Sequence, residues 1–152
     1  MSSDIINSLT EYDKCSINKI MNLIRPKWTM EIILELIVAG SNSLAFSDFE
    51  KLITGINPRI LSTRLASLSK KGIIDRIVPD PKTPKKVRYK LSAKGFEFLN
   101  VLLAMRAWAV KHLDVKEECA RDECRHMLVI KEKYIKPQKE REGLILDLIA
   151  PH

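Results

Sequence analysis

The apolar residues in the first forty positions recur at the three- and four-residue spacing of an α-helix. They predict one helix within residues 5–24, which Pro26 ends, and a second helix from Pro26 to about residue 39. The second helix has the broader apolar stripe and ends at the turn sequence of residues 40–43, so we expect it near the centre of the core. Its stripe consists of Trp28, Ile32, Leu36 and Ala39, flanked by Ile33 and Ile37.

Two shorter helical patterns come next, joined by a turn that contains Gly55. After an extended candidate at residues 44–46, Ser47 with Glu50 has the spacing of a capping box and predicts a helix over 48–53. Asn57 and Pro58 then predict the cap and first position of a helix that continues to about residue 71. We expect its buried stripe to be Ile60, Leu61, Leu65 and Leu68, and its outer face to carry Arg59, Ser62, Thr63, Ala66, Ser67 and Lys70.

The spacing of these two helices is that of a helix-turn-helix, although an antiparallel helix pair in any small α-helical protein gives the same pattern. The next segment is more specific: residues 73–78 and 86–91 both have strand character and predict a hairpin. The proline-rich loop between them carries lysines at both shoulders and is long enough to project as a wing. Ser92 then caps a helix that runs to about residue 113, with a stripe of Phe96, Leu99, Leu103 and Ala107.

The rest of the chain is largely charged, apart from apolar clusters such as residues 127–130, which we expect to be covered. The pattern therefore predicts a mainly α fold with a small β-hairpin, in the α+β class, and extra helices at both ends. We expect residues 1–113 to form a winged helix-turn-helix domain that includes the N-terminal helix. Residues 114–152 would form a helical extension that packs on this domain.

Positive charge is concentrated in the helix and hairpin. The chain has a formal net charge of +7, yet residues 57–90 hold ten basic and two acidic side chains, so the remaining residues sum to about −1. A basic surface of this kind suits double-stranded DNA, since a helix fits the major groove and lysines contact phosphates, although a solvated basic face is the plain alternative. The candidate DNA-binding residues are Ser47, Asn57, Arg59, Ser62, Thr63, Arg64, Ser67, Lys82, Lys85, Lys86 and Arg88.

Motifs for catalysis and cofactor binding are missing from the sequence, so we expect no enzyme activity and no cofactor. The candidate metal ligands are Cys119, Cys124 and His126, with His112 upstream, but they lack paired ligand spacing, and we expect packing rather than metal. Cys15, at the start of the first helix beside lysines, is either a reactive thiol or a small buried residue. Three cysteines, no secretion signal and no long apolar span indicate a cytoplasmic protein outside the membrane.

Several segments, in order, resemble the HxlR-type winged helix regulators of bacteria and archaea. They are Cys15–Ile17, Pro26–Thr29, Phe46–Phe49, Gly55–Asn57, Leu61–Leu65 with Leu68, Lys71–Arg76, Pro84–Gly95 and Trp108, and they span residues 15–108. The resemblance implies a homodimeric, DNA-binding transcription regulator. Its first and last domain helices would form the dimer interface, so residues 1–113 would include an N-terminal dimerisation helix, and its wings would contact adjacent minor grooves of a palindromic operator. The extension of residues 114–152 is longer than the family usually carries, and we expect it to extend this dimer interface or to pack on the domain.

The same resemblance matches Cys15 to the cysteine with which some members sense electrophiles or oxidants, so an oxidant or another small molecule is a candidate effector. The chain departs from the family at Pro26, where glycine is usual, at Ala45, where arginine is common, and at Arg88, where an acidic residue is common. These departures leave sequence preference and wing contacts open. The alternative function is a winged helix protein-interaction module whose basic face docks an acidic partner.

Overall fold

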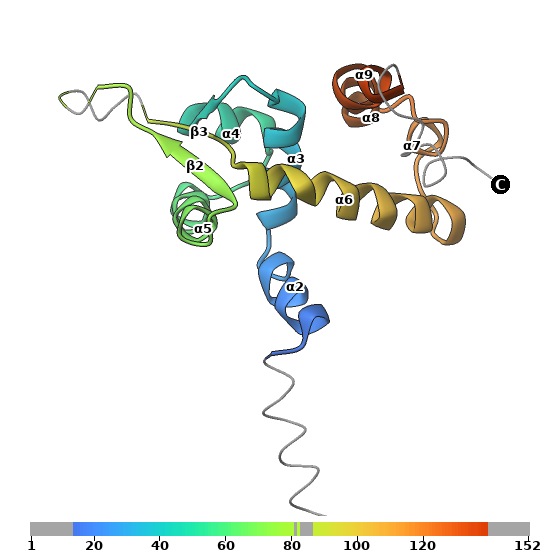
Figure 1. Cartoon of the computed structure of the whole chain (residues 1–152), viewed down its shortest axis with the longest axis horizontal. Helices are drawn as coiled ribbons and strands as arrows, with labels where there is room; N and C mark the ends of the chain where they lie inside the picture. Colours follow the sequence, from blue (N-terminus) through green and yellow to red (C-terminus); the bar gives the residue numbers. More distant parts are fainter. Residues whose placement is uncertain (1–13, 81, 83–86, 140–152) are drawn as a thin grey trace, which may run out of the picture.

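The computed structural model of the protein describes residues 14–80, 82 and 87–139 (Figure 1). Its N-terminal half contains helix α2 (Ser16–Ile24), helix α3 (Thr29–Ala39), strand β1 (Leu44–Ala45), helix α4 (Phe46–Leu52) and helix α5 (Pro58–Lys70). Strands β2 (Ile74–Ile77) and β3 (Arg88–Leu91) form the hairpin, and the long helix α6 (Ala93–His112) follows. The extension contains α7 (Glu117–Ala120), α8 (Arg125–Ile130), the π-helical turn η2 (Lys131–Ile135) and α9 (Lys136–Lys139).

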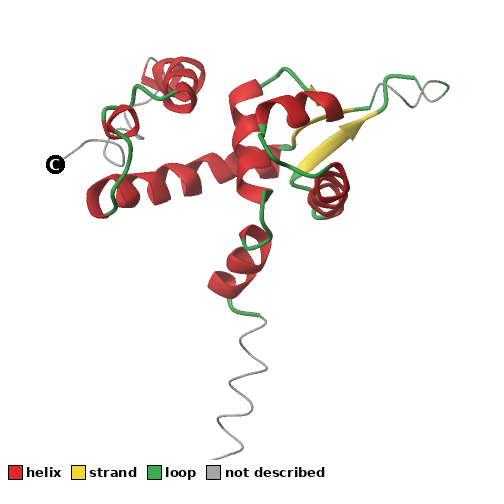
Figure 2. Cartoon of the chain, turned by 180° about the vertical axis from the view of Figure 1, so that it is seen from behind, coloured by secondary structure: helices red, strands yellow, loops and turns green. Residues whose placement is uncertain are grey.

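The three strands form one antiparallel sheet in the order β1-β3-β2 (Figure 2). Ile74 is opposite Leu91 in the hairpin, and Leu44 of β1 is opposite Tyr89 on the other side of β3. The expected hairpin is confirmed, although its strands are shorter than 73–78 and 86–91. Of the extended candidate at residues 44–46, the first two residues form the third strand of the sheet and Phe46 begins α4. The hairpin extends away from the helices and ends in the loop that the sequence indicates as a wing (Figure 1).

Helix α3 lies at the centre of the core, as its apolar stripe predicts. It passes between the α4–β3 side of the molecule and the helices of the extension (Figure 1). It contributes Ile32, Ile33, Leu36, Ile37 and Val38; α5 contributes Leu61, Leu65 and Leu68, α6 contributes Phe98, Leu99 and Leu103, and the extension contributes Met127 and Ile130. The extension therefore shares the core of the helix-turn-helix. Met127 and Ile130 of the cluster at residues 127–130 are covered as expected, whereas Leu128 is 54% exposed.

Two residues of the expected stripes are outside the core. Ile60 is 37% exposed and Phe96 is 39% exposed, whereas Phe98, which the stripe of α6 omitted, is buried. Ile60 precedes the buried Leu61 by one position, and one residue turns a helix by about 100°, which carries the side chain off the buried face. Phe96 and Phe98 are two positions apart, which corresponds to about 200° around the helix, so they lie on nearly opposite faces of α6 and the buried stripe runs through Phe98 instead of Phe96.

The start of α4 also differs from the expectation. The helix begins at Phe46, two residues before the predicted position, and Ala45 rather than Ser47 is the capping residue. The carboxylate of Asp48 accepts a hydrogen bond from the backbone N–H of Ala45 at 2.8 Å. The side chain three positions after the cap thus satisfies a free donor at the helix start, and Ser47 lies exposed within the first turn.

The fold class is mainly α with a small antiparallel sheet, in agreement with the sequence pattern. Within the described ranges, no helix has the length and apolar character needed to cross a membrane.

Candidate nucleic-acid interface

Helix α5 is anchored on one side and open on the other. Asn57 takes the N-cap position, where its Oδ1 accepts a hydrogen bond from the backbone N–H of Arg59 at 2.8 Å, and Pro58 follows at the first helical position. Both features agree with the sequence prediction. Three leucines, Leu61, Leu65 and Leu68, fix the inner face in the core. The helix can therefore present its other face as a rigid surface.

The outer face of α5 carries the side chains that the sequence assigned to DNA. Asn57, Arg59, Ser62 and Thr63 are exposed, whereas Arg64 and Ser67 are half-buried. The hydroxyl of Thr63 donates to the backbone carbonyl of Arg59 at 2.9 Å, which orients it along the helix and leaves its oxygen able to accept. The structure therefore brings these six residues together on one helix, with the guanidinium of Arg59 near its N-terminal end.

Arg64 has a specific structural contact. Its Nε–H donates to the backbone carbonyl of Lys27 at 3.0 Å, which joins α5 to the corner between α2 and α3. The sequence predicts that Arg64 lies at the flank of the groove, and the structure shows that its side chain contacts the corner between α2 and α3.

The wing residues differ in what they contact. Lys82 is exposed, and its backbone N–H donates to Asp80 at 2.8 Å, while Lys85 and Lys86 lie outside the described residues. Arg88, at the base of the wing, donates from Nε to the hydroxyl of Ser43 at 2.8 Å and from a terminal nitrogen to the Ser43 carbonyl. It also lies 3.9 Å from the carboxylate of Asp48. Arg88 thus ties the hairpin to the start of α4, a contact that the sequence did not indicate.

The arginines of the described residues fall into two groups. Four are paired with carboxylates: Arg88 with Asp48, Arg106 with Asp122, Arg121 with Glu117 and Glu123, and Arg125 with Glu35. The other four, Arg25, Arg59, Arg64 and Arg76, have no ion pair with a described carboxylate. Two of these lie on α5, Arg25 ends α2, and Arg76 is on β2, which packs against α5. The uncompensated guanidinium charge therefore gathers around the exposed helix.

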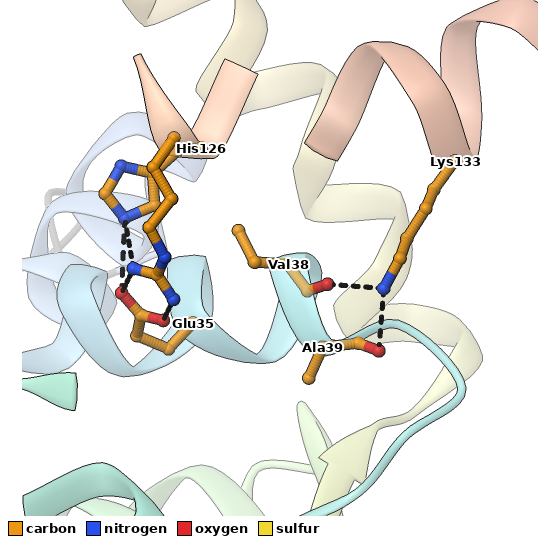
Figure 3. A network of polar contacts seen from close by, with 6 residues as sticks. Glu35, Val38, Ala39, His126 and Lys133 are labelled. Atoms are coloured by element: carbon orange, nitrogen blue, oxygen red, sulfur yellow. Dashed lines mark hydrogen bonds and ion pairs between the residues drawn. The ribbon is translucent and has the colours of Figure 1, made fainter. Parts of the chain in front are cut away.

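A second polar cluster joins the extension to α3, and the sequence gave no indication of it. Glu35 is buried, and its carboxylate accepts two hydrogen bonds from Arg125, at 2.9 and 2.7 Å, with Nε2 of His126 at 3.2 Å (Figure 3). Burial alone raises the pKa of Glu35, but the hydrogen bonds and positive charge of Arg125 and His126 outweigh it, and the net shift lowers the pKa. Glu35 therefore stays charged inside the protein.

The extension also caps the C-terminal end of α3. The ammonium of Lys133 donates to the carbonyl oxygens of Val38 and Ala39 at 2.7 and 3.1 Å (Figure 3). The hydroxyl of Tyr134 donates to the carbonyl of Ile37 at 2.6 Å, and burial raises the pKa of this tyrosine. These groups bond to the carbonyls that a helix end leaves without partners, and the lysine also complements the helix dipole.

The four candidate metal ligands are not brought together as one set, since only Cys119 and Cys124 are neighbours. α6 ends at His112, so the continuous helix that would align His112 with Cys119 and His126 does not form. His112 contacts the ring of Trp108 at a centroid distance of 5.1 Å, and His126 contacts Glu35. No group of three or more potential ligands occurs in the part of the chain that the structure describes.

The cysteines have separate environments. The thiols of Cys119 and Cys124 are neighbours, and their hydrogen bond is the main cause that raises the pKa of Cys119. Cys15 caps α2 without a side-chain hydrogen bond and is exposed. In the single chain Cys15 is therefore not a small buried residue, which was the alternative to a reactive thiol.

Comparison with known proteins identifies the architecture. The family model described as HxlR-like helix-turn-helix matches residues 23–117. The chain belongs to this family. The resemblance seen in the sequence is thus confirmed, and the match ends before most of the extension, which the family model does not cover.

Individual relatives agree with this assignment. The HTH-type transcriptional regulator YdeP of Bacillus subtilis is 30% identical over 107 residues, which cover 70% of this chain and 80% of YdeP. The reduced form of the transcriptional regulator YodB from Bacillus subtilis is 29% identical, with a TM-score of 0.55 over 64% of this chain and 93% of YodB. The quinone-bound YodB has 26% identity and a TM-score of 0.53 over 64% and 98%. The chain is an HxlR-like transcription regulator with a winged helix DNA-binding fold.

Proposed function

We propose that the protein acts as a homodimer on a palindromic operator, with α5 in the major groove and the wing at residues 79–86 on the backbone or minor groove. The observation that carries this proposal is the gathering of unpaired arginines around the exposed face of α5. Arginine forms bidentate hydrogen bonds with guanine and strong contacts with phosphate, and a guanidinium that is not paired with a carboxylate of its own chain keeps its charge available for both.

Exposed apolar residues support the dimer. Ile17 and Met21 of α2 are 68% and 44% exposed, and on α6 Met105 and Trp108 are 46% and 59% exposed. Apolar side chains gathered on helices in this way mark an interaction surface rather than a solvated one. We infer that α2 and α6 pair with the same helices of a second copy, which places the two α5 helices on successive half-sites. The exposed Leu128 of α8 gives the extension a place in the same interface.

Fluorescence anisotropy with labelled duplex DNA tests the proposal. We expect wild-type protein to bind DNA, and the logarithm of its affinity to fall linearly with the logarithm of the salt concentration, because binding releases counterions from phosphates. Arg59→Ala should weaken binding by about 1–3 kcal/mol. Arg121→Ala removes an exposed, carboxylate-paired arginine from the extension and is the matched control. An absence of binding at low salt, or an equal effect of both variants, would show that α5 is not the DNA-binding element.

A second part of the proposal concerns Cys15 as a sensor of electrophiles or oxidants. Its support is the exposure of the thiol at the start of α2, together with the quinone-bound state of the related YodB. The thiolate would add to a quinone ring carbon, forming a C–S bond, while the ring takes up a proton and becomes a hydroquinone. Mass spectrometry after benzoquinone treatment should show one adduct at Cys15, with a loss of DNA affinity that Cys15→Ser does not show. Equal loss in wild type and Cys15→Ser would remove this role.

A further inference from the structure

The corner between α2 and α3 lies directly beside α5. The hydrogen bond from Arg64 Nε to the Lys27 carbonyl, at 3.0 Å, joins residues that are 37 positions apart in the sequence. Arg64 is half-buried at the middle of α5, whereas Lys27 is exposed. The corner thus has a fixed place at the side of the helix whose outer face carries the unpaired arginines.

The Lys27 side chain lies over the ring of the next residue, Trp28. Trp28 has a φ of 75° and a ψ of −3°, a left-handed conformation that a bulky residue adopts only where its surroundings impose it. Its indole ring packs against the hydrophobic core, and the ammonium of Lys27 lies 4.7 Å from the ring centroid. The attraction between the ammonium and the face of the indole ring favours this position of the Lys27 side chain, at the corner that Arg64 joins to α5.

The charge of this corner is uncompensated. Neither Arg25 nor Lys27 forms an ion pair with a carboxylate of the described residues, in contrast to Lys131 and Lys136 of the extension, which pair with Asp122 and Glu132. Lysines that are held in place beside a DNA-binding helix, with their charge unpaired, are suited to phosphate rather than to base edges.

We propose that Lys27 contacts a backbone phosphate beside the major groove that α5 enters, and that Arg64 is a positioning residue that holds the corner in place. The proposal rests on the proposed function and extends its surface from α5 and the wing to the α2–α3 corner. The DNA footprint of each protomer then has three parts: the wing, the recognition helix α5, and Lys27 on the other flank of α5.

The test is the salt dependence of binding to a random-sequence duplex of about 30 base pairs. Such a duplex is sufficient because phosphate contacts contribute to affinity whatever the DNA sequence is. Lys27→Met should lower the slope of log affinity against log salt by about 0.9 for each bound protomer. Wild type should then lose about 3.5-fold more affinity per protomer than the variant between about 50 and 200 mM salt. Lys27→Arg should restore the slope. Lys116→Met, at the exposed N-cap position of α7 in the extension, is the matched control and should leave the slope unchanged.

Tryptophan emission gives a second, local measurement. The chain contains two tryptophans, so Trp108→Phe leaves Trp28 as the single reporter beneath the Lys27 ammonium. DNA should change the Trp28 emission as the ammonium moves toward phosphate, and Lys27→Met should abolish that change. Arg64→Lys keeps the net charge of the protein but removes the Nε–H that donates to the Lys27 carbonyl. This variant should therefore show a smaller DNA-induced change in Trp28 emission than the protein with Arg64.

The outcomes separate this inference from the proposed function. If wild-type protein binds no duplex at low salt, the proposed function itself fails. If wild type binds and Arg59→Ala weakens it, while Lys27→Met keeps the wild-type slope and affinity, the DNA-binding role of α5 stands and the phosphate contact of Lys27 is overturned. Equal loss of slope in Lys27→Met and Lys116→Met would also overturn it, since the effect would then be one of net charge.

Discussion

Glu35 is a charged residue in the core of the helix-turn-helix whose hydrogen-bond partners come from the extension. Its side chain is 7% exposed, and the bidentate hydrogen bonds of Arg125 hold it as a carboxylate (Figure 3). Arg125→Met should leave this charge with only His126 at 3.2 Å. We expect the variant to lose stability because a buried carboxylate without its main partner bears the cost of desolvation.

The size of this loss depends on the exposure of the two partners. Removing one member of a fully buried ion pair costs about 3–5 kcal/mol. The Arg125 side chain is 50% exposed, so solvent screens part of the interaction, and His126 remains beside Glu35. We therefore expect Arg125→Met to lower the free energy of unfolding by about 2 kcal/mol. Glu35→Gln removes the buried charge, so Arg125→Met should lower the free energy of unfolding less in this background than in wild type. The difference should give a coupling energy of about 1 kcal/mol in a double-mutant cycle.

Urea unfolding of the full chain at pH 7 measures these values from the shift in midpoint at constant slope. Arg121→Met is the control, because its pairs with Glu117 and Glu123 are exposed and should contribute less than about 0.5 kcal/mol. Equal effects of Arg125→Met and Arg121→Met, or strict additivity with Glu35→Gln, would refute the importance of the buried pair.

The same pair predicts a dependence on pH. The pKa of Glu35 is lowered from its ordinary value of 4.5, so the native state binds its proton more weakly than the unfolded state. The stability that Glu35 contributes is present above about pH 4.5 and is lost as the pH falls through the lower, folded-state value. This loss of stability at low pH should be smaller in Arg125→Met and absent in Glu35→Gln. Unfolding curves measured between pH 3 and 7, at intervals of roughly half a pH unit, test this.

Three further changes have defined outcomes in the same unfolding assay. Gly95→Ala should lower stability by about 2 kcal/mol or more, because a Cβ on Gly95 would lie 2.0 Å from the carbonyl oxygen of Ile73; unchanged stability would contradict this packing. Asn57→Ala removes the cap of α5 and should cost about 1 kcal/mol, whereas Asn57→Gly should cost only a few tenths. Tyr134→Phe removes the donor to the Ile37 carbonyl and should cost about 1 kcal/mol, and a loss below about 0.3 kcal/mol would mean that water replaces the hydroxyl.

Local patterns in the sequence predicted much of the fold. Asn57 and Pro58 began α5 at the right position, and Ser92 capped α6, where its hydroxyl accepts from the N–H of Gly95 at 3.0 Å. These signals involve residues within a few positions of each other, so the sequence contains them directly. The predicted start of α4 was wrong because the capping residue is Ala45, which has no capping side chain, and Asp48 rather than Glu50 is the acidic residue that bonds back to the backbone N–H of the cap.

The parts that could not be predicted depend on long-range contacts. The pair of Glu35 with Arg125 joins positions 90 apart, and the Arg64 bond to Lys27 joins positions 37 apart. Arg88 is a similar case. The alternation of basic and apolar residues placed it on a strand with a basic face and so among the candidate DNA-binding residues, but the fold brings its side chain against Ser43 and Asp48. The net positive charge of residues 57–90 was visible in the sequence, whereas which of these charges have internal partners was decided only by tertiary structure.

Two copies of α5 should bind one DNA site with two-fold symmetry, and selection of bound duplexes from a random-sequence library by the wild-type protein is the sharpest test of this proposal. We predict an enriched inverted repeat, with half-site centres about 10 base pairs or a multiple of that apart, and no enrichment with Arg59→Ala. Bound sequences without any enriched motif would contradict the proposal and would favour a basic face that docks an acidic protein.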